Sequence, residues 1–239
     1  MDTIKISHGN TQIIAHRGVS GIETENTCAA FVAAGNRSYF GIETDVRQTL
    51  DGKFVLLHDD TTERCAGDCL IPEKCTLQTL QSLRLLDKGD TRSRSDLRFP
   101  SLAEYLRICK RYDKVGVLEF KGEFSPAAMK RLIEEVETEY AREKMIFISF
   151  SFENLLTLRN VCPKAHAQFL SGECKEETVS LVKEHNMGLD LYYNALDEKT
   201  VKRLLKEGIE LNCWTVDDPE IAERLIRWGV QYITSNILE

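Results

Sequence analysis

The stretch Gly41-Ile42-Glu43-Thr44-Asp45-Val46 gives the clearest indication of how this chain folds and what it binds. We interpret it as a β-strand, in which side chains alternate between the two faces, so Glu43 and Asp45 point to the same face. Two carboxylates about 6–7 Å apart on one face repel each other. A hard divalent cation such as Mg²⁺ or Ca²⁺ would relieve that repulsion. The alternative interpretation is a strand with a solvent-facing acidic edge.

Strand patterns like this one alternate with helical patterns along the whole chain. The patterns typical of strands lie at residues 12–15, 41–46, 54–57, 115–120, 145–150, 165–170, 189–192, 209–216 and 232–234. A turn signal at Leu50-Asp51-Gly52 joins the second and third strands into a hairpin. Eight βα units without a long linker predict a single-domain α/β protein with a (β/α)₈ TIM barrel over residues 1–239. The alternative is an open doubly wound sheet, but no Gly-rich dinucleotide fingerprint follows the first strand.

Local signals also predict where several helices begin and end. Asn26 is expected to cap the first helix, and Gly35 is expected to follow its last residue as a C′ glycine. Ser101 and Glu104 have the spacing of a capping box. Gly229 is expected to end the last helix, which Asp218-Pro219 opens.

Residues 60–100 interrupt the regular alternation, since they are rich in charged residues and cysteine. We expect a small irregular insertion after the His58 strand, with one short helix around residues 77–83. Its position at the end of a barrel strand suggests a head-group pocket or a lid. Three of its residues, Cys65, Cys69 and Cys75, are conceivable zinc ligands. Their irregular spacing, with no fourth cysteine or nearby histidine, argues against a structural zinc site.

Composition and charge restrict the classes of function. The 239 residues carry a formal net charge of −7, and an acidic chain lacks the basic excess needed to bind nucleic acid as its main partner. Apolar runs are shorter than the roughly 18 residues of a membrane span, and the N-terminal MDTIKISHGN is too polar for a signal peptide. These features predict a cytoplasmic protein with free cysteine thiols and no stable membrane insertion. A homo-oligomer is compatible with the sequence.

Polar residues gather at the carboxyl ends of the predicted strands. In a (β/α)₈ barrel that end holds the active site, so these side chains should converge there. The candidates are His16, Arg17, Glu43, Asp45, His58, Glu119, Lys121 and Trp214. Two histidines, three carboxylates, two cations and an aromatic ring at one end of a barrel favour a catalytic site.

Several of these residues also have a purely structural interpretation. His16 could be a satisfied buried histidine, and His58 could be a turn residue. Lys121 could form a structural ion pair with Glu119. Trp214 could belong to the core, as most strand tryptophans do. Their shared position at strand ends is what favours the functional interpretation.

The combination of motifs resembles the glycerophosphodiester phosphodiesterase family over nearly the whole chain. The matching motifs are His16-Arg17-Gly18, Glu25-Asn26-Thr27, Glu43-Thr44-Asp45, Thr49-x-Asp51-Gly52, His58-Asp59, Leu118-Glu119-x-Lys121 and Trp214-Thr215-Val216. Each motif alone is weak, but their order and spacing are specific. The resemblance implies a (β/α)₈ barrel that hydrolyses glycerophosphodiesters to glycerol 3-phosphate and an alcohol, with Mg²⁺ or Ca²⁺.

Three positions depart from the usual pattern of that family. Thr24 stands where the family usually has Pro, Asp217 where it has Asn, and Ser235 where it has Asp. No predicted ligand or catalytic residue is lost. Asp217 adds a negative charge near the predicted mouth of the barrel, which bears on substrate preference.

The residues suggest a hypothesis for the mechanism. Glu43, Asp45 and Glu119 would hold one divalent cation, and a poor leaving alkoxide needs a proton. The acid and base would be His16 and His58, because imidazole titrates near neutral pH. The substrate-binding residues would be Arg17 and Lys121 at the phosphate and Trp214 at the glycerol. The sequence leaves open which histidine is the acid, and whether water or the glycerol 2-hydroxyl is the nucleophile.

Two other functions fit parts of this pattern. A phospholipase-like enzyme would cleave a membrane phosphodiester with a similar two-histidine site, but the sequence shows no signal peptide and no evident apolar membrane-binding loop. A non-catalytic binding module would keep the barrel as a scaffold, but a degenerate member should lose histidine or carboxylate positions. We therefore expect the small-molecule phosphodiesterase.

Overall fold

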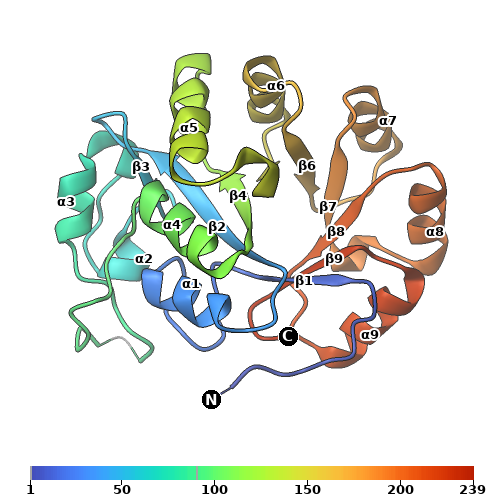
Figure 1. The fold of residues 1–239 in the computed structure, drawn as a ribbon, viewed down its shortest axis with the longest axis horizontal. Coiled ribbons are helices and arrows are strands. Elements are labelled where there is room, and N and C mark those ends of the chain that lie inside the picture. Colours follow the sequence, from blue (N-terminus) through green and yellow to red (C-terminus); the bar gives the residue numbers. More distant parts are fainter. Residues whose placement is uncertain (1, 90) are drawn as a thin grey trace.

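Eight parallel strands form a closed barrel in the computed structural model, which describes residues 2–89 and 91–239 (Figure 1). The strands are β1 (Gln12–Ala15), β2 (Gly41–Gln48), β4 (Val115–Phe120), β5 (Met145–Ser149), β6 (His166–Ser171), β7 (Gly188–Tyr192), β8 (Leu211–Trp214) and β9 (Tyr232–Ser235). The ring closes because β1 pairs with both β2 and β9. The predicted single-domain (β/α)₈ barrel is confirmed, and closure excludes the open doubly wound sheet.

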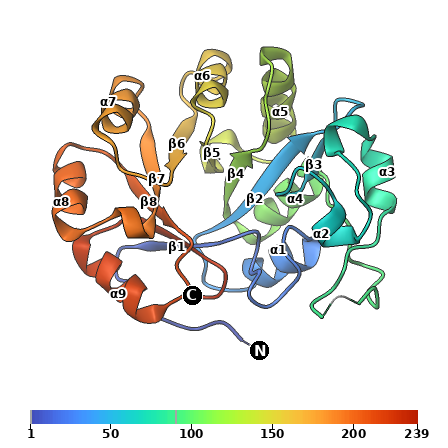
Figure 2. The same cartoon turned by 180° about the vertical axis from the view of Figure 1, so that it is seen from behind.

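Helices surround the barrel on its outside (Figures 1 and 2). They are α1 (Cys28–Gly35), α4 (Leu102–Tyr112), α5 (Pro126–Glu139), α6 (Phe152–Val161), α7 (Glu176–Glu184), α8 (Glu198–Lys206) and α9 (Pro219–Trp228), with the 3₁₀ turns η2 (Arg142–Lys144) and η3 (Tyr193–Ala195). Each crossover helix covers apolar side chains on the outer faces of the strands. Among the described residues, no helix combines the length and the apolar character needed to cross a membrane.

Apolar side chains pack on both faces of the barrel strands, in one region between the strands and the helices and in another inside the barrel. Outward side chains such as Leu189 and Leu191 of β7 join the large core beneath the helices. Inward side chains alternate with them, and a small apolar cluster of Ile14, Val117, Ile146, Ile148 and Leu170 fills part of the barrel. The inward positions nearer the carboxyl ends of the strands are therefore the ones that can carry polar chemistry.

The segment after β2 forms the predicted hairpin and insertion. Strand β3 (Phe54–Leu56) runs antiparallel to β2, with Leu56 opposite Val46. The insertion contains α2 (Glu63–Ala66), η1 (Pro72–Lys74) and α3 (Leu77–Ser82). It has a satellite core of its own, built around Val55, Leu80 and Phe99, so it is more regular than the sequence suggested. All eight cysteines of the chain are free thiols.

The predicted ends of the first helix were wrong, although the other caps were confirmed. Thr27, rather than Asn26, caps α1, because Asn26 adopts a left-handed φ of 52° and turns its side chain toward β2. Gly35 is the last helical residue and Asn36 is the C-cap. The capping box of Ser101 with Glu104 and the left-handed C-cap at Gly229 are present as predicted.

The two ends of the described chain lie side by side (Figures 1 and 2). Ile4 forms a β-bridge with Leu238, and the backbone N–H of Ile6 donates to the carbonyl of Glu239 at 2.8 Å. The side chain of Glu239 accepts hydrogen bonds from the backbone N–H and the hydroxyl of Ser38. These contacts hold the terminal segments against the seam where β9 meets β1.

Candidate active site

A cavity of about 110 Å³ opens at the carboxyl ends of the barrel strands. The predicted residues that line it are His16, Arg17, Glu43, His58, Glu119, Lys121 and Trp214. The eighth, Asp45, lies beside them and is fully buried. Residues as far apart in the sequence as His16 and Trp214 therefore meet as predicted, because parallel strands bring all their carboxyl ends to one side of the barrel.

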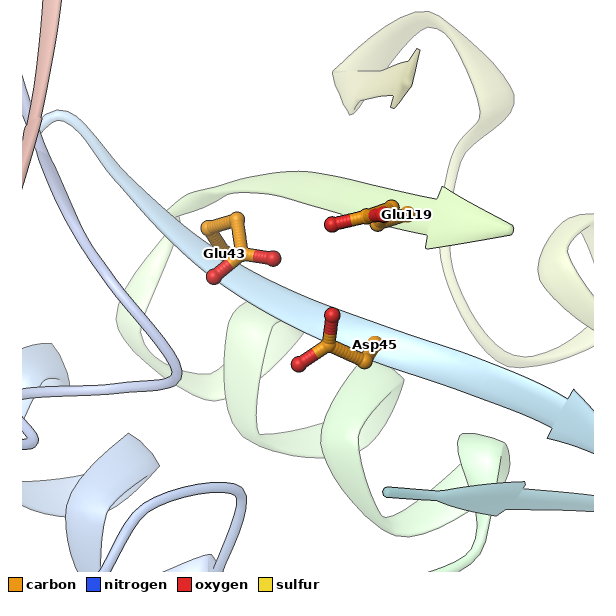
Figure 3. A group of neighbouring side chains, drawn as sticks. All are labelled: Glu43, Asp45 and Glu119. Atoms are coloured by element: carbon orange, nitrogen blue, oxygen red, sulfur yellow. The ribbon is translucent and has the colours of Figure 1, made fainter. Parts of the chain in front are cut away.

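Three buried carboxyl groups form the centre of the site. Glu43 and Asp45 lie two residues apart on β2, and Asp45 is the register partner of Glu119 on β4. Figure 3 shows the three side chains pointing toward one another from the two neighbouring strands. Each offers a carboxylate oxygen within 4.8 Å of the others. Among residues 2–89 and 91–239, this is the group close enough to share a metal ion, and the three insertion cysteines do not form one.

The electrostatics of this triad suit a bound cation. Burial, followed by the charge of Asp45, raises the pKa of Glu43 well above its ordinary value and the pKa of Glu119 to about 8. Burial alone would raise the pKa of Asp45 too, but Lys121 and Arg17 outweigh it and lower that pKa to about 2. The buried Oδ1 of Asp45 faces the Nζ of Lys121 at 3.3 Å without a well-formed hydrogen bond. An oxygen-rich, under-satisfied triad matches the preference of Mg²⁺ and Ca²⁺ for oxygen ligands.

The raised pKa of Glu119 makes a prediction about stability without metal. Its folded pKa of about 8 lies above its ordinary value of 4.5, so between these values the folded protein holds a proton that the unfolded chain has released, and stability falls as pH rises. In EDTA, Glu119→Gln should become more stable than the wild type by about 1–2 kcal/mol between pH 6.5 and 8. In thermal melts, the Tm of Glu119→Gln minus the Tm of the wild type should grow by about 2–8 °C as the pH rises from about 6.5 to 8.

The comparison between the two proteins reports on the triad and Lys121 together, because Glu119 also raises the pKa of Glu43 and of Lys121. Adding Mg²⁺ or Ca²⁺ should raise the Tm of the wild type and so reduce the advantage of the variant. Melting temperatures of wild type and Glu119→Gln that run parallel from pH 6.5 to 8 in EDTA would contradict the predicted electrostatic penalty.

His16 follows β1 and faces the triad with one ring nitrogen. Its Nδ1 lies 2.7 Å from Oδ1 of Asn236, and its Nε2 lies 3.9 Å from a carboxylate oxygen of Glu43. Burial and the neighbouring Arg17 lower the pKa of His16 to about 4. The imidazole is therefore neutral at neutral pH, with one nitrogen turned toward the cavity.

His58 follows the hairpin strand and is anchored differently. Its Nδ1 lies 2.7 Å from a carboxylate oxygen of Asp59, and Arg64 holds that carboxylate through two hydrogen bonds of 2.6 and 3.0 Å. Burial lowers the pKa of His58, whereas the charge of Asp45 opposes that shift. His58 thus has a carboxylate against its ring, whereas the corresponding nitrogen of His16 has an amide oxygen.

Two cations border the triad. The guanidinium of Arg17 contacts Glu25 at 2.8 Å and Asp45 at 3.5 Å, and its backbone N–H donates to Glu43 at 2.8 Å. The Nζ of Lys121 lies 2.6 Å from Glu119 and 3.3 Å from Asp45. These ion pairs are structural contacts, and they also hold two positive charges at a cavity that can receive an anion.

The loop that carries Arg17 depends on the glycine that follows it. Gly18 has a φ of 74°, and a Cβ at this position would lie 2.6 Å from the Cβ of Ala30 in α1. Its backbone N–H also donates to the carbonyl of Glu43 at 3.1 Å. A glycine is therefore required for the loop to pass between α1 and β2 and to present Arg17 to the triad.

Aromatic side chains form one wall of the cavity. The Nε1 of Trp214 donates to the backbone carbonyl of Asp190 at 3.2 Å. Its ring lies 5.5 Å, centre to centre, from both Phe150 and Tyr192. Phe150 also faces the Nζ of Lys121 at 5.9 Å. The cavity is therefore lined by aromatic rings as well as by charged groups.

The sequence interpretation missed three residues of the site. Asn26, interpreted as a helix cap, donates to Asp45 at 2.8 Å and accepts from Thr44 at 2.7 Å. Asp190 is a buried acid on the inner face of β7. The only sign of this in the sequence is that Asp190 lies between two leucines, which occupy the outer face of the strand. Asn236 contacts His16 across 220 positions of sequence, and no local pattern predicts it.

Comparison with known proteins identifies relatives of this fold and site. The sequence profile of the Glycerophosphoryl diester phosphodiesterase family matches residues 16–238. A glycerophosphodiester phosphodiesterase of Caldanaerobacter subterraneus subsp. tengcongensis is 30% identical over 233 residues, covering 95% of this chain and 94% of that protein.

Solved structures share the same architecture. A glycerophosphodiester phosphodiesterase from Parabacteroides distasonis superposes with a TM-score of 0.78 and 27% identity, covering 96% of this chain and 94% of that one. An Oleispira antarctica phosphodiesterase, solved with the product sn-glycerol-3-phosphate, has a TM-score of 0.86 at 22% identity, covering 94% and 92% of the two chains, and shows the common fold. This chain therefore belongs to the glycerophosphoryl diester phosphodiesterase family and is a phosphoric diester hydrolase.

Proposed function

We propose that this protein hydrolyses small glycerophosphodiesters to glycerol 3-phosphate and an alcohol, with one divalent cation and two histidines. The observation that carries the proposal is a cavity lined by His16, His58, Glu43 and Glu119, with Asp45 buried beside it. A phosphodiester needs its charge neutralised and its leaving group protonated, and this cavity offers groups for both tasks. The family relationship supports the same substrate class.

The residues that would hold Mg²⁺ or Ca²⁺ are Glu43, Asp45 and Glu119. Their burial, their mutual repulsion and the closeness of their oxygens fit a hard cation. When bound, the cation supplies Lewis-acid stabilisation to the charge that develops on the phosphate. Asn26 donates to Asp45 and so orients one ligand of the site.

The substrate would contact both the charged and the aromatic residues that line the cavity. Arg17 and Lys121 would bind the non-bridging phosphate oxygens, because their positive charges lie beside the triad. Trp214 and Phe150 would pack against the carbon chain of the glycerol. A neighbouring groove of about 570 Å³ is lined by Lys121, by Arg47 of β2 and by Glu73 of the insertion. The alcohol head group would lie in this groove.

The proton transfers would be divided between the histidines. His16, neutral and with Nε2 toward the cavity, would take a proton from the nucleophile, which is water or the glycerol 2-hydroxyl. His58 would give a proton to the leaving alkoxide, since the hydrogen bond to Asp59 opposes the lowering of the His58 pKa by burial. His16 and His58 follow different strands, but both line the same cavity.

A membrane phosphodiester is the second candidate substrate. The observation that favours it is exposed apolar surface near the mouth, where Phe150 is 50% and Leu50 66% exposed. The same acid–base groups would serve that reaction. The small diester is preferred because a relative 30% identical to this chain is a glycerophosphodiester phosphodiesterase. The proposal takes residues 1–239 as one catalytic domain acting in the cytoplasm, with a small molecule and not nucleic acid as partner.

A substrate panel tests this function. Purified protein with Mg²⁺ or Ca²⁺ should release glycerol 3-phosphate from glycerophosphocholine, glycerophosphoethanolamine, glycerophosphoglycerol or glycerophosphoinositol, measured with a coupled glycerol-3-phosphate assay. Vesicles of phosphatidylinositol and sphingomyelin serve as the parallel arm. Turnover of vesicles without turnover of any soluble diester would replace the proposal with the lipid alternative, and inactivity toward both would refute each.

A further inference from the structure

Three residues at the carboxyl ends of β8 and β9 form a hydrogen-bonded unit behind His16, which we name the Asp217 clamp: Asp217, Ser235 and Asn236. The Oδ1 of Asp217 accepts from the hydroxyl of Ser235 at 2.9 Å and from the backbone N–H of Asn236 at 2.8 Å. The Oδ2 of Asp217 accepts from the side-chain amide of Asn236 at 2.6 Å. Both carboxylate oxygens are thus engaged by the neighbouring strand end.

The carboxylate of Asp217 determines how the amide of Asn236 is oriented. A carboxylate only accepts hydrogen bonds, so the NH₂ group of Asn236 must face Asp217 and its carbonyl oxygen must face away. That oxygen lies 2.7 Å from Nδ1 of His16 and also accepts from the hydroxyl of Ser20 at 2.6 Å. The flipped amide would set its NH₂ group against the two groups that now donate to its oxygen.

The orientation of the amide in turn determines the tautomer of His16. Because an amide oxygen accepts but does not donate, Nδ1 of His16 must carry the hydrogen. In the neutral ring, Nε2 is then an unprotonated acceptor, and this is the nitrogen 3.9 Å from Glu43 on the cavity side. One carboxylate, acting through one amide, therefore selects which nitrogen of His16 is free in the cavity.

We propose that Asp217 and Asn236 are positioning residues for the reaction, which hold His16 in its Nδ1–H tautomer with Nε2 directed into the cavity. The inference rests on the proposed role of His16 in acid–base chemistry and adds to it how that role is fixed. Neither clamp residue lines the cavity, so each acts through the imidazole and not on the substrate. The clamp also places an uncharged amide, rather than a carboxylate, against the ring.

The structural alternative is that the clamp merely ties β8 to β9. It predicts that loss of the Asn236 side chain lowers stability without altering the tautomer of His16. The two explanations are separated by measuring the ring nitrogens directly, because protonated and unprotonated imidazole nitrogens have distinct ¹⁵N chemical shifts.

Asn236→Ala is the first test. In ¹⁵N-labelled protein, the spectrum of His16, assigned by comparison with His16→Ala, should change from a single Nδ1–H tautomer to a mixture. The kcat for a glycerophosphodiester should fall by about 10–100-fold, the range for partners that orient a functional histidine, with KM changed less than about threefold. Asn36→Ala is the matched control, because Asn36 is exposed at the end of α1 and contacts Val32 and Tyr112.

The double variant Asp217→Asn with Asn236→Asp is the second test, and it remains informative if Asn236→Ala folds poorly. The new amide at position 217 can still accept from the hydroxyl of Ser235 and the N–H of residue 236, and it can donate to the new carboxylate at position 236. That carboxylate can still accept from His16 and Ser20. The exchange preserves every hydrogen bond of the clamp, so the Nδ1–H tautomer should persist and kcat should exceed that of Asn236→Ala at least about tenfold.

The outcomes distinguish the inference from the proposed function. An unchanged Nδ1–H signature and a kcat within about twofold of wild type in Asn236→Ala would overturn the clamp, whatever the reaction. A double variant in which Nδ1 of His16 carries no hydrogen would overturn it too. A lost tautomer with unchanged kcat would refute the positioning role, and full activity of His16→Ala would show that the proposed function failed instead.

Discussion

Removal of divalent cations with EDTA is expected to abolish turnover of glycerophosphodiesters, and added Mg²⁺ or Ca²⁺ is expected to restore it. The physical reason is the triad of Glu43, Asp45 and Glu119, whose buried carboxylates repel one another and place oxygens close enough together to share one cation. A bound cation provides several kcal/mol of stabilisation to the charge that develops on phosphate, so activity should fall by on the order of 10³-fold or more without it. A glycerol-3-phosphate assay in metal-free and metal-supplemented buffer measures this.

Two comparisons make the metal experiment specific. Glu119→Gln should be inactive in both buffers, because an amide replaces one charged ligand. Its thermal stability should respond little to Mg²⁺ or Ca²⁺, whereas the wild type should gain stability through ligand binding. Turnover that persists after exhaustive dialysis against EDTA would remove the cation from the mechanism.

His16→Ala and His58→Ala should each lower kcat by about 10²–10⁴-fold, the usual contribution of one positioned acid or base. Both imidazoles line the same cavity as the triad, and each has one nitrogen anchored by a protein oxygen, at 2.7 Å in both cases. Arg17 and Lys121, which we propose bind the phosphate, remain in both variants, so KM should change much less than kcat. Steady-state kinetics on one soluble diester provides the measurement.

His166→Ala is the matched control for these two variants. His166 begins β6 at the opposite end of the barrel and pairs with Glu210, so its loss should leave kcat unchanged. Circular dichroism should show that all three variants keep the fold. Near-normal activity of either His16→Ala or His58→Ala would exclude the paired-histidine scheme.

The barrel and the convergence of the site residues could be predicted from sequence because both follow from local rules. Strand and helix periodicities need only neighbouring residues, and parallel connectivity then brings the carboxyl ends of β1, β2, β4 and β8 to one side. Glu43, Asp45 and Glu119 could therefore be grouped without knowing a single distance. The register that sets Asp45 beside Glu119 agrees with that grouping.

The misses arose where a long-range contact outweighed a local signal. Asn26 has the residue type of a helix cap, but its amide is used by Asp45 and Thr44, so the neighbouring Thr27 caps α1 instead. Asp190 lacks any motif, since its meaning depends on a position inside the barrel. Head-group choice could not be predicted either, because the groove beside Lys121 is shaped by the insertion and contains no local motif for a ligand.

The contact between His16 and Asn236 has a consequence for how the protein is made. It joins residues 220 positions apart, at the seam where the last strand pairs with the first. During synthesis, β1 emerges early, and the edge that pairs with β9 stays unpaired until β9 has been translated. Closing so large a loop is entropically costly and slow. The nascent chain should therefore remain catalytically silent until β9 and Asn236 have left the ribosome, when barrel closure and assembly of the active site occur together.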